Sequence, residues 1–90
     1  MPKNKTQEEL EVALQDAHTK IVVGGTYVHF KNSEHTYTVI GLAIQEATEK
    51  ICVLYQPNYG NKLLFVRDLD VWLETPEFNG KNVPRFRLIS

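Results

Sequence analysis

Cysteine is nearly absent from this chain of 90 residues. Cys52 is the only one, so neither an intramolecular disulfide nor a thiolate metal cluster can form. The three histidines, at 18, 29 and 35, lack the spacing of metal ligands, and we expect no metal and no other cofactor. An unpaired thiol suits a reducing compartment, which favours a cytoplasmic protein.

The chain also lacks an excess of charge and any long apolar run. Ten basic residues stand against eleven acidic ones, which gives a net charge of −1 and argues against a nucleic-acid partner. The apolar runs are too short to span a bilayer, so we expect no membrane partner. Residues 1–6 are followed by no apolar segment, which predicts that they are not a secretory signal.

Catalytic motifs are missing as well. Ser33 lies in a predicted turn beside Glu34 and His35, and such sequence neighbours rarely form a catalytic triad. The segment 23–26 lacks the lysine and the helix of a phosphate loop. Cys52 stands between isoleucine and valine, which indicates a buried thiol. We therefore assign no catalytic residue.

The first 21 residues carry a helical pattern. Thr6 and Glu9 match a capping box, in which each side chain accepts a hydrogen bond from the other residue's backbone N–H. Apolar residues then recur at helical spacing at positions 10, 13, 14, 17 and 21. We predict a helix from about Gln7 to His18, within an N-terminal helical extension that covers residues 1–21.

Residues 22–90 read as β structure. Two β-rich runs, 22–30 and 36–44, flank the turn-forming residues 31–35 and predict an antiparallel hairpin, with a break or bulge at Gly24-Gly25. Further strands are expected at 51–56, 63–67 and 83–89, the last at an edge or beginning near Pro84. Asp68 is the expected N-cap of a helical turn that holds Trp72, and Asn79-Gly80 predicts a tight turn. By analogy, this order indicates a mainly β, five-stranded, SH3-like, partly open barrel with a helical turn before the last strand.

Several motifs resemble one family. They are Gly24-Gly-Thr-Tyr-Val-His-Phe-Lys31, Tyr37-Thr-Val-Ile-Gly41, Val53-Leu-Tyr55, Phe65-Val-Arg67 and Val83-Pro-Arg-Phe86. Their order resembles the pattern of the domain of unknown function 1653 family of small bacterial proteins, over about residues 23–89. The resemblance implies a compact SH3-like β fold and no established activity.

This sequence departs from the family pattern at two places. Asp68 stands where the pattern usually has proline, and the segment 43–48 lacks the histidine of the A-x-H-S-E-T motif. Any role of that histidine is therefore absent here.

Aromatic residues on the predicted hairpin make a candidate binding face. Tyr27 and His29 are two residues apart and share a strand face, and Tyr37 lies across the hairpin. Such a face stacks a base or holds a peptide proline. The alternative, a cross-strand packing cluster with a structural histidine, is the more frequent outcome. Tyr59 lies in a Pro-Asn-Tyr-Gly loop, where ligand contacts concentrate, whereas Trp72 is expected to anchor the helical turn.

Two arginines are candidates for anion binding. Arg67 and Arg85 adjoin apolar residues in predicted strands, and each guanidinium could receive a phosphate or carboxylate. The alternative is an ion pair with one of three acidic residues of the same stretch, at positions 70, 74 and 77.

The leading hypothesis is a non-catalytic binding module for a small molecule or peptide, a nucleotide included. Its candidate residues are Tyr27, His29, Tyr37, Tyr59, Arg67 and Arg85. One alternative is a small enzyme with His29 as general base; another is an RNA-binding barrel. We expect a monomer or a weak dimer, because charged and proline-containing strand ends protect the sheet edges.

Overall fold

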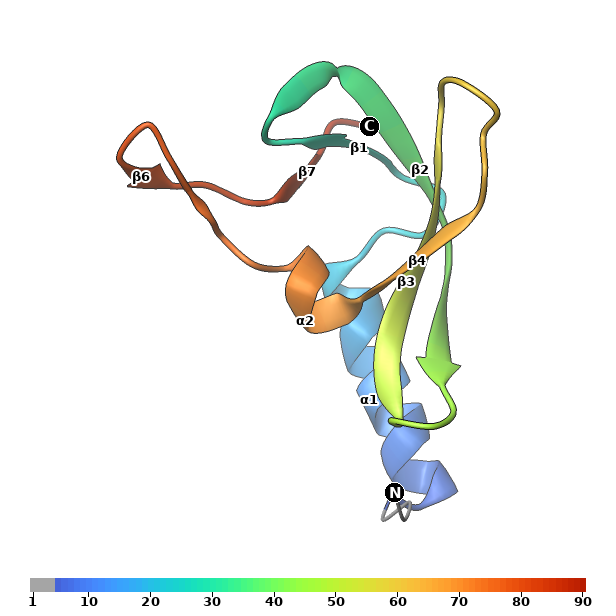
Figure 1. Cartoon of the computed structure of the whole chain (residues 1–90). Helices are drawn as coiled ribbons and strands as arrows, with labels where there is room; N and C mark the ends of the chain where they lie inside the picture. Colours follow the sequence, from blue (N-terminus) through green and yellow to red (C-terminus); the bar gives the residue numbers. More distant parts are fainter. Residues whose placement is uncertain (1–4) are drawn as a thin grey trace.

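The computed structural model describes residues 5–90, so the first four residues of the expected N-terminal extension lie outside it. The elements in chain order are α1 (Gln7–Lys20), β1 (Thr26–His29), β2 (Asn32–Gln45), β3 (Lys50–Pro57), β4 (Phe65–Asp68), α2 (Leu69–Trp72), β5 (Glu77–Phe78), β6 (Lys81–Asn82) and β7 (Phe86–Leu88). Five strands form one antiparallel sheet in the order β4-β3-β2-β1-β7, and β5 pairs with β6 in a separate hairpin (Figure 1).

The predicted fold class is confirmed. The chain is mainly β, with an N-terminal helix and a short helix before the later strands. The sheet does not close, because β4 and β7 lie at its two edges and do not pair, as in a partly open barrel.

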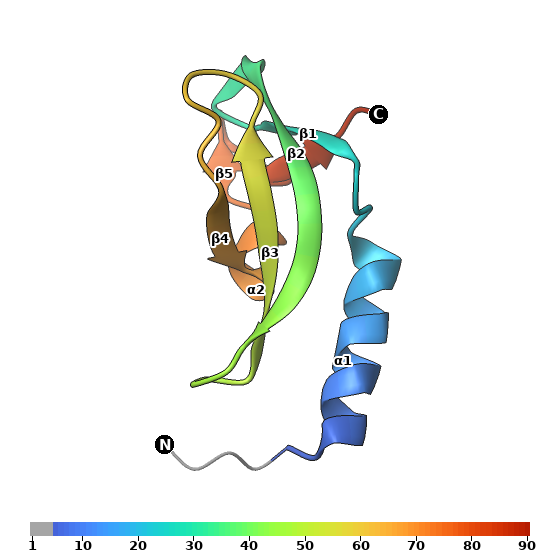
Figure 2. The ribbon, with the colours of Figure 1, turned by 90° about the vertical axis from the view of Figure 1, so that its right-hand side faces the viewer.

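The helix α1 begins as predicted. Thr6 accepts a hydrogen bond from the Glu9 N–H at 3.1 Å, and the Glu9 carboxylate accepts one from the Thr6 N–H at 2.8 Å. The helix continues to Lys20, two residues beyond the expected end. It runs beside β2 (Figure 2), and both Ala17 and Ile21 are fully buried.

The prediction of a first strand from residue 22 is wrong. Gly24 has a φ of 85° and belongs to a turn closed by a hydrogen bond from the Gly25 N–H to the Val22 carbonyl. A Cβ atom on Gly25 would lie 2.8 Å from Leu88 Cδ1 and 2.9 Å from the Val22 carbonyl oxygen. The two glycines therefore mark a tight turn before β1, which begins at Thr26.

The hairpin between β1 and β2 is tighter than predicted. His29 pairs with Asn32, so the turn consists of residues 30–31 and not 31–35. Strand β2 therefore begins four residues early and runs to Gln45. A bulge at Ile40 shifts its register against β3.

The end of the chain also differs from the prediction. Asn79 and Gly80, with φ of 55° and 80°, form the expected tight turn, but it joins β5 to β6 in a hairpin that projects from the sheet (Figure 1). The last strand begins only at Phe86, after Pro84. It lies at the sheet edge, as predicted.

The core lies between the inner face of the sheet and α2. Its buried members are Ile21, Tyr27, Val39, Val53, Tyr55, Trp72 and Phe86. The Trp72 ring is 2% exposed and stacks on Phe86 at 3.7 Å, so it anchors α2 to the sheet as expected. In the described part of the chain, no helix has the length and apolar character that a membrane crossing requires.

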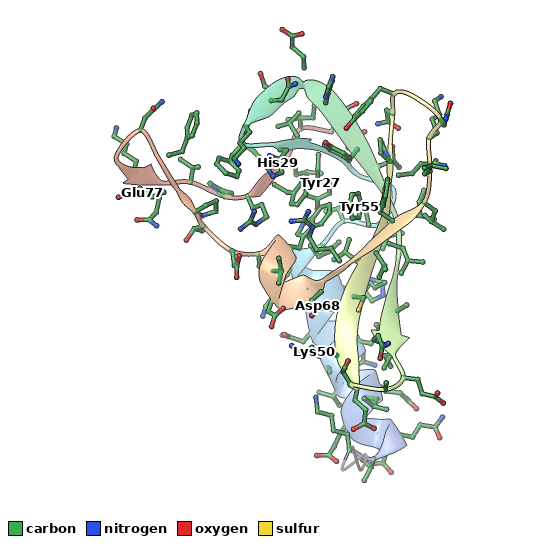
Figure 3. The ribbon with its side chains drawn as sticks, viewed as in Figure 1. Tyr27, His29, Lys50, Tyr55, Asp68 and Glu77 are labelled. Atoms are coloured by element: carbon green, nitrogen blue, oxygen red, sulfur yellow. The ribbon has the colours of Figure 1, made fainter. Side chains whose placement is uncertain are left out.

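The prediction of Asp68 as the N-cap of α2 is correct in position but wrong about the side chain. Asp68 occupies the N-cap position but makes no side-chain capping bond. Its carboxylate accepts a weak hydrogen bond from Cys52 Sγ at 3.5 Å and lies 3.7 Å from Lys50 Nζ (Figure 3).

Candidate functional site

Tyr27 belongs to the core. It is 5% exposed and packs edge-on against Trp72 with ring centroids 5.5 Å apart. Its hydroxyl accepts a hydrogen bond from the Val22 N–H at 3.0 Å. Figure 3 shows Tyr27 and Tyr55 pointing into the space between the strands and α2. Because its ring and its hydroxyl both have partners inside the protein, Tyr27 fits the packing alternative.

Tyr37 and Tyr59 form a pair at the surface. Their hydroxyl oxygens are 3.0 Å apart, and the Tyr37 ring lies edge-on to Phe86. Partial burial and then the hydrogen bond to Tyr59 raise the pKa of Tyr37 to about 12, so this phenol stays neutral. Tyr59 is 40% exposed, and the His35 ring stacks on it at 4.1 Å. Thus the loop after β3 is tied to β2 by ring contacts as well as by the hydroxyl pair.

Arg67 extends from β4 over the core aromatics. Its guanidinium carbon lies 5.3 Å from the centroid of the Phe86 ring. This cation–π contact joins β4 and β7, the two edge strands, which do not pair with each other. Its strand partner is Val53, a buried residue of the inner face. Among residues 5–90, no carboxylate forms a salt bridge with Arg67.

Arg85 forms an ion pair with an acidic residue, which was the alternative to anion binding. Its Nη2 lies 2.8 Å from the Glu74 carboxylate. Its Nε is buried and has no hydrogen-bond partner in the part of the chain that the structure describes. The Arg85 guanidinium therefore already binds a carboxylate of the same chain, whereas the Arg67 guanidinium forms no such salt bridge among residues 5–90.

His29 is a neutral hydrogen-bond donor. Its Nδ1 accepts a hydrogen bond from the Lys31 N–H at 3.2 Å, which places the ring proton on Nε2. Partial burial lowers the pKa of His29, and the positive charges of Arg67, Arg85 and Lys31 lower it further. The ring packs on Phe86 at 5.1 Å. Its neutral form thus offers an N–H and not a free basic nitrogen.

Phe65 is a surface residue that the sequence analysis did not single out. It is 45% exposed and lies on the same face of β4 as Arg67, two residues away. A hollow of about 240 Å³ has Phe65, Tyr59 and Lys62 among its lining residues. The period of two in the predicted strand 63–67 was the available signal, since it places Phe65 and Arg67 side by side.

Together these residues form a surface that we call the aromatic–arginine surface: Tyr37, Tyr59, Phe65 and Arg67. Three of its four members were candidates from the sequence. The fourth candidate in this region, His29, has a pKa lowered first by partial burial and then by the charge of Arg67.

Metal binding has no support in the described part of the chain. Residues 5–90 contain no group of three or more histidine, cysteine, aspartate or glutamate side chains that could hold an ion. Cys52 is 2% exposed, and burial raises its pKa, so its thiol is buried as the sequence indicated.

Comparisons with known proteins agree on one family. The model of a family described as "Protein of unknown function (DUF1653)" matches residues 25–88. A crystal structure of a DUF1653 protein from Bordetella bronchiseptica superposes with a TM-score of 0.64 at 29% identity, over 73% of this chain and 85% of that one. No curated protein matches the chain.

Proposed function

The chain belongs to the DUF1653 family of proteins of unknown function, and we propose that it is a non-catalytic binding module whose ligand is a nucleotide. The observation that carries the proposal is the aromatic–arginine surface. It combines an arginine that has no acidic partner among residues 5–90 with two partly exposed rings that line a hollow.

The chemistry of this surface matches the two halves of a nucleotide. A base is planar and stacks favourably on aromatic rings, which Tyr59 and Phe65 offer in the lining of the hollow. A phosphate suits the guanidinium of Arg67, because a charge-assisted pair with an arginine is strong and directional. Lys62 adds a second positive charge at the margin.

The peptide alternative loses its main support. The face expected to hold a proline was formed by Tyr27, His29 and Tyr37, and Tyr27 is 5% exposed and packed against Trp72 in the core. RNA binding would need a patch of positive charge, but Lys31, Lys62 and Lys81 lie on three separate segments: the turn after β1, the loop after β3 and strand β6.

An enzyme with His29 as general base is also disfavoured. A base must offer an unprotonated nitrogen to its substrate. In His29 that nitrogen is Nδ1, which already accepts the Lys31 N–H. The other nitrogen carries the proton, so the neutral ring donates a hydrogen bond instead.

The test is a binding titration with a nucleoside monophosphate and the matching nucleoside, followed by calorimetry. Arg67→Gln should weaken binding of the monophosphate at least tenfold and change binding of the nucleoside little, because only the phosphate contact is lost. Arg87→Gln is the matched control, since it removes an exposed arginine from β7 at the opposite sheet edge.

Two outcomes would contradict the proposal. One is no binding of any nucleotide by the wild-type protein at millimolar concentration. The other is an equal loss of affinity in the Arg67 and Arg87 variants, which would indicate unspecific charge attraction.

A further inference from the structure

His29 and Arg67 each carry hydrogen-bond donors that no acceptor among residues 5–90 binds. In His29 the donor is the Nε2–H, because Nδ1 already accepts the Lys31 N–H. In the same part of the chain, Arg85 Nε is the one buried side-chain nitrogen or oxygen without a hydrogen-bond partner. The half-buried His29 and Arg67 therefore present their free N–H groups to solvent, where a ligand can reach them.

The two side chains meet at one aromatic ring. His29 pairs with Phe86 across β1 and β7, so their side chains lie on the same face of the sheet, with ring centroids 5.1 Å apart. The Arg67 guanidinium carbon reaches the same ring from β4, 5.3 Å from its centroid. Phe86 is itself fixed by stacking on Trp72 at 3.7 Å. A rigid ring thus holds both donors at one place on the sheet, although they come from strands that do not pair.

We propose that His29 and Arg67 bind one phosphate group together, and that this group is a phosphate monoester. The inference rests on the proposed nucleotide ligand and names its class. A guanidinium binds two oxygens of a phosphate side by side, and the His29 N–H then binds the third. A phosphate diester has only two terminal oxygens, so it would leave the His29 N–H without a partner. The preferred ligand is therefore a nucleoside monophosphate and not its cyclic phosphate.

The charges around His29 favour the same ligand. A phosphate monoester carries close to two negative charges above about pH 7, whereas a diester carries one. The positive charges of Arg67, Arg85 and Lys31 all act on His29 and support its lowered pKa. Arg85 contributes charge rather than a contact, because its guanidinium binds Glu74. The surroundings of the two donors are thus positive, although the net charge of the chain is −1.

Calorimetry of the full chain at about pH 8, where the monoester is a dianion, tests the selectivity. The wild-type protein should bind a nucleoside 5′-monophosphate at least fivefold more tightly than the 3′,5′-cyclic monophosphate of the same nucleoside. His29→Phe keeps a ring against Phe86 but removes the N–H, so it should abolish this preference by weakening the monophosphate alone. His29→Gln retains an N–H donor and should restore most of the preference. Amide NMR spectra show whether both variants remain folded.

Inorganic phosphate provides a test that does not need a nucleotide. A bound dianion favours the protonated ring, so phosphate should raise the pKa of His29 in the wild-type protein, and should do so much less in Arg67→Gln. A pH titration by NMR with and without phosphate measures this change. The signals of His18 on α1 are the internal control, because they should titrate alike in both conditions.

The outcomes separate this inference from the proposed function. If no nucleotide binds but phosphate raises the His29 pKa through Arg67, the proposed function fails and the shared phosphate site stands. If the monophosphate binds through Arg67 but His29→Phe leaves its affinity unchanged, or weakens both nucleotides equally, the shared site is overturned and the proposed function stands. Equal wild-type affinity for the two nucleotides, or a His29 pKa that neither phosphate nor monophosphate raises, also overturns it.

Discussion

Arg67 links several features at the scale of single residues. Its charge lowers the pKa of His29, its guanidinium covers the Phe86 ring, and its strand neighbour Phe65 lines the hollow beside Tyr59. An arginine held over an aromatic ring keeps its hydrogen-bonding edge available, since the ring occupies only its face. The proposed phosphate contact depends on that availability.

A prediction about His29 follows. Its pKa should lie below 6.5, and Arg67→Gln should raise it, because one of the positive charges that oppose protonation is lost. A pH titration of the His29 ring signals by NMR measures this directly. Arg87→Gln should leave the pKa unchanged. A wild-type pKa at or above 6.5 would contradict the described surroundings of the ring.

The same shift sets the sign of a pH effect on stability. The folded protein binds a proton at His29 less readily than the unfolded chain does, so the free energy of unfolding should fall as pH drops below 6.5 and continue to fall down to the folded-state pKa. His29→Gln should reduce this slope. Urea unfolding at several pH values between neutral and mildly acidic conditions would detect it.

At the scale of elements, the turn before β1 depends on a missing side chain. Gly25→Ala should destabilise the fold by about 1–3 kcal/mol, because the new Cβ would meet the Val22 carbonyl, which is backbone and cannot move aside cheaply. Gly41→Ala is the matched control: a Cβ there has no neighbour within 4 Å. Thermal unfolding of both variants measures the difference. Equal melting temperatures would show that the turn adapts.

The elements also show what the sequence could reveal. The helix, its capping box and most strands follow from periodicity and local hydrogen bonds, so they were predictable from neighbouring residues. The bulge at Ile40 and the early start of β2 depend on pairing with β1 and β3, which are set by tertiary contacts. For the same reason, the side chains around Arg67 could be named as candidates, but Arg67 could not be separated from Arg85 until Glu74 was located.

At the scale of the whole molecule, the core crosses the proposed boundary between the helical extension and the barrel. Ile21, the last residue of the extension, packs with Tyr27, Val39 and Trp72. We therefore expect residues 22–90 alone to unfold at a lower temperature than the full chain. If the shortened chain does not fold, Ile21→Ala in the full chain should still lose about 2–5 kcal/mol. An unchanged melting temperature in either protein would indicate an independent barrel.

The central claim is that one surface of this open sheet, at Tyr37, Tyr59, Phe65 and Arg67, binds a nucleotide. The most direct measurement is a map of amide chemical-shift changes in isotopically labelled protein on addition of a nucleoside monophosphate. We predict that the changes concentrate on these four residues and their neighbours, and that Arg67→Gln, while it stays folded, needs at least tenfold more nucleotide to reach the same changes. Changes confined to α1 or to the β5–β6 hairpin, or no changes at millimolar nucleotide, would contradict the account.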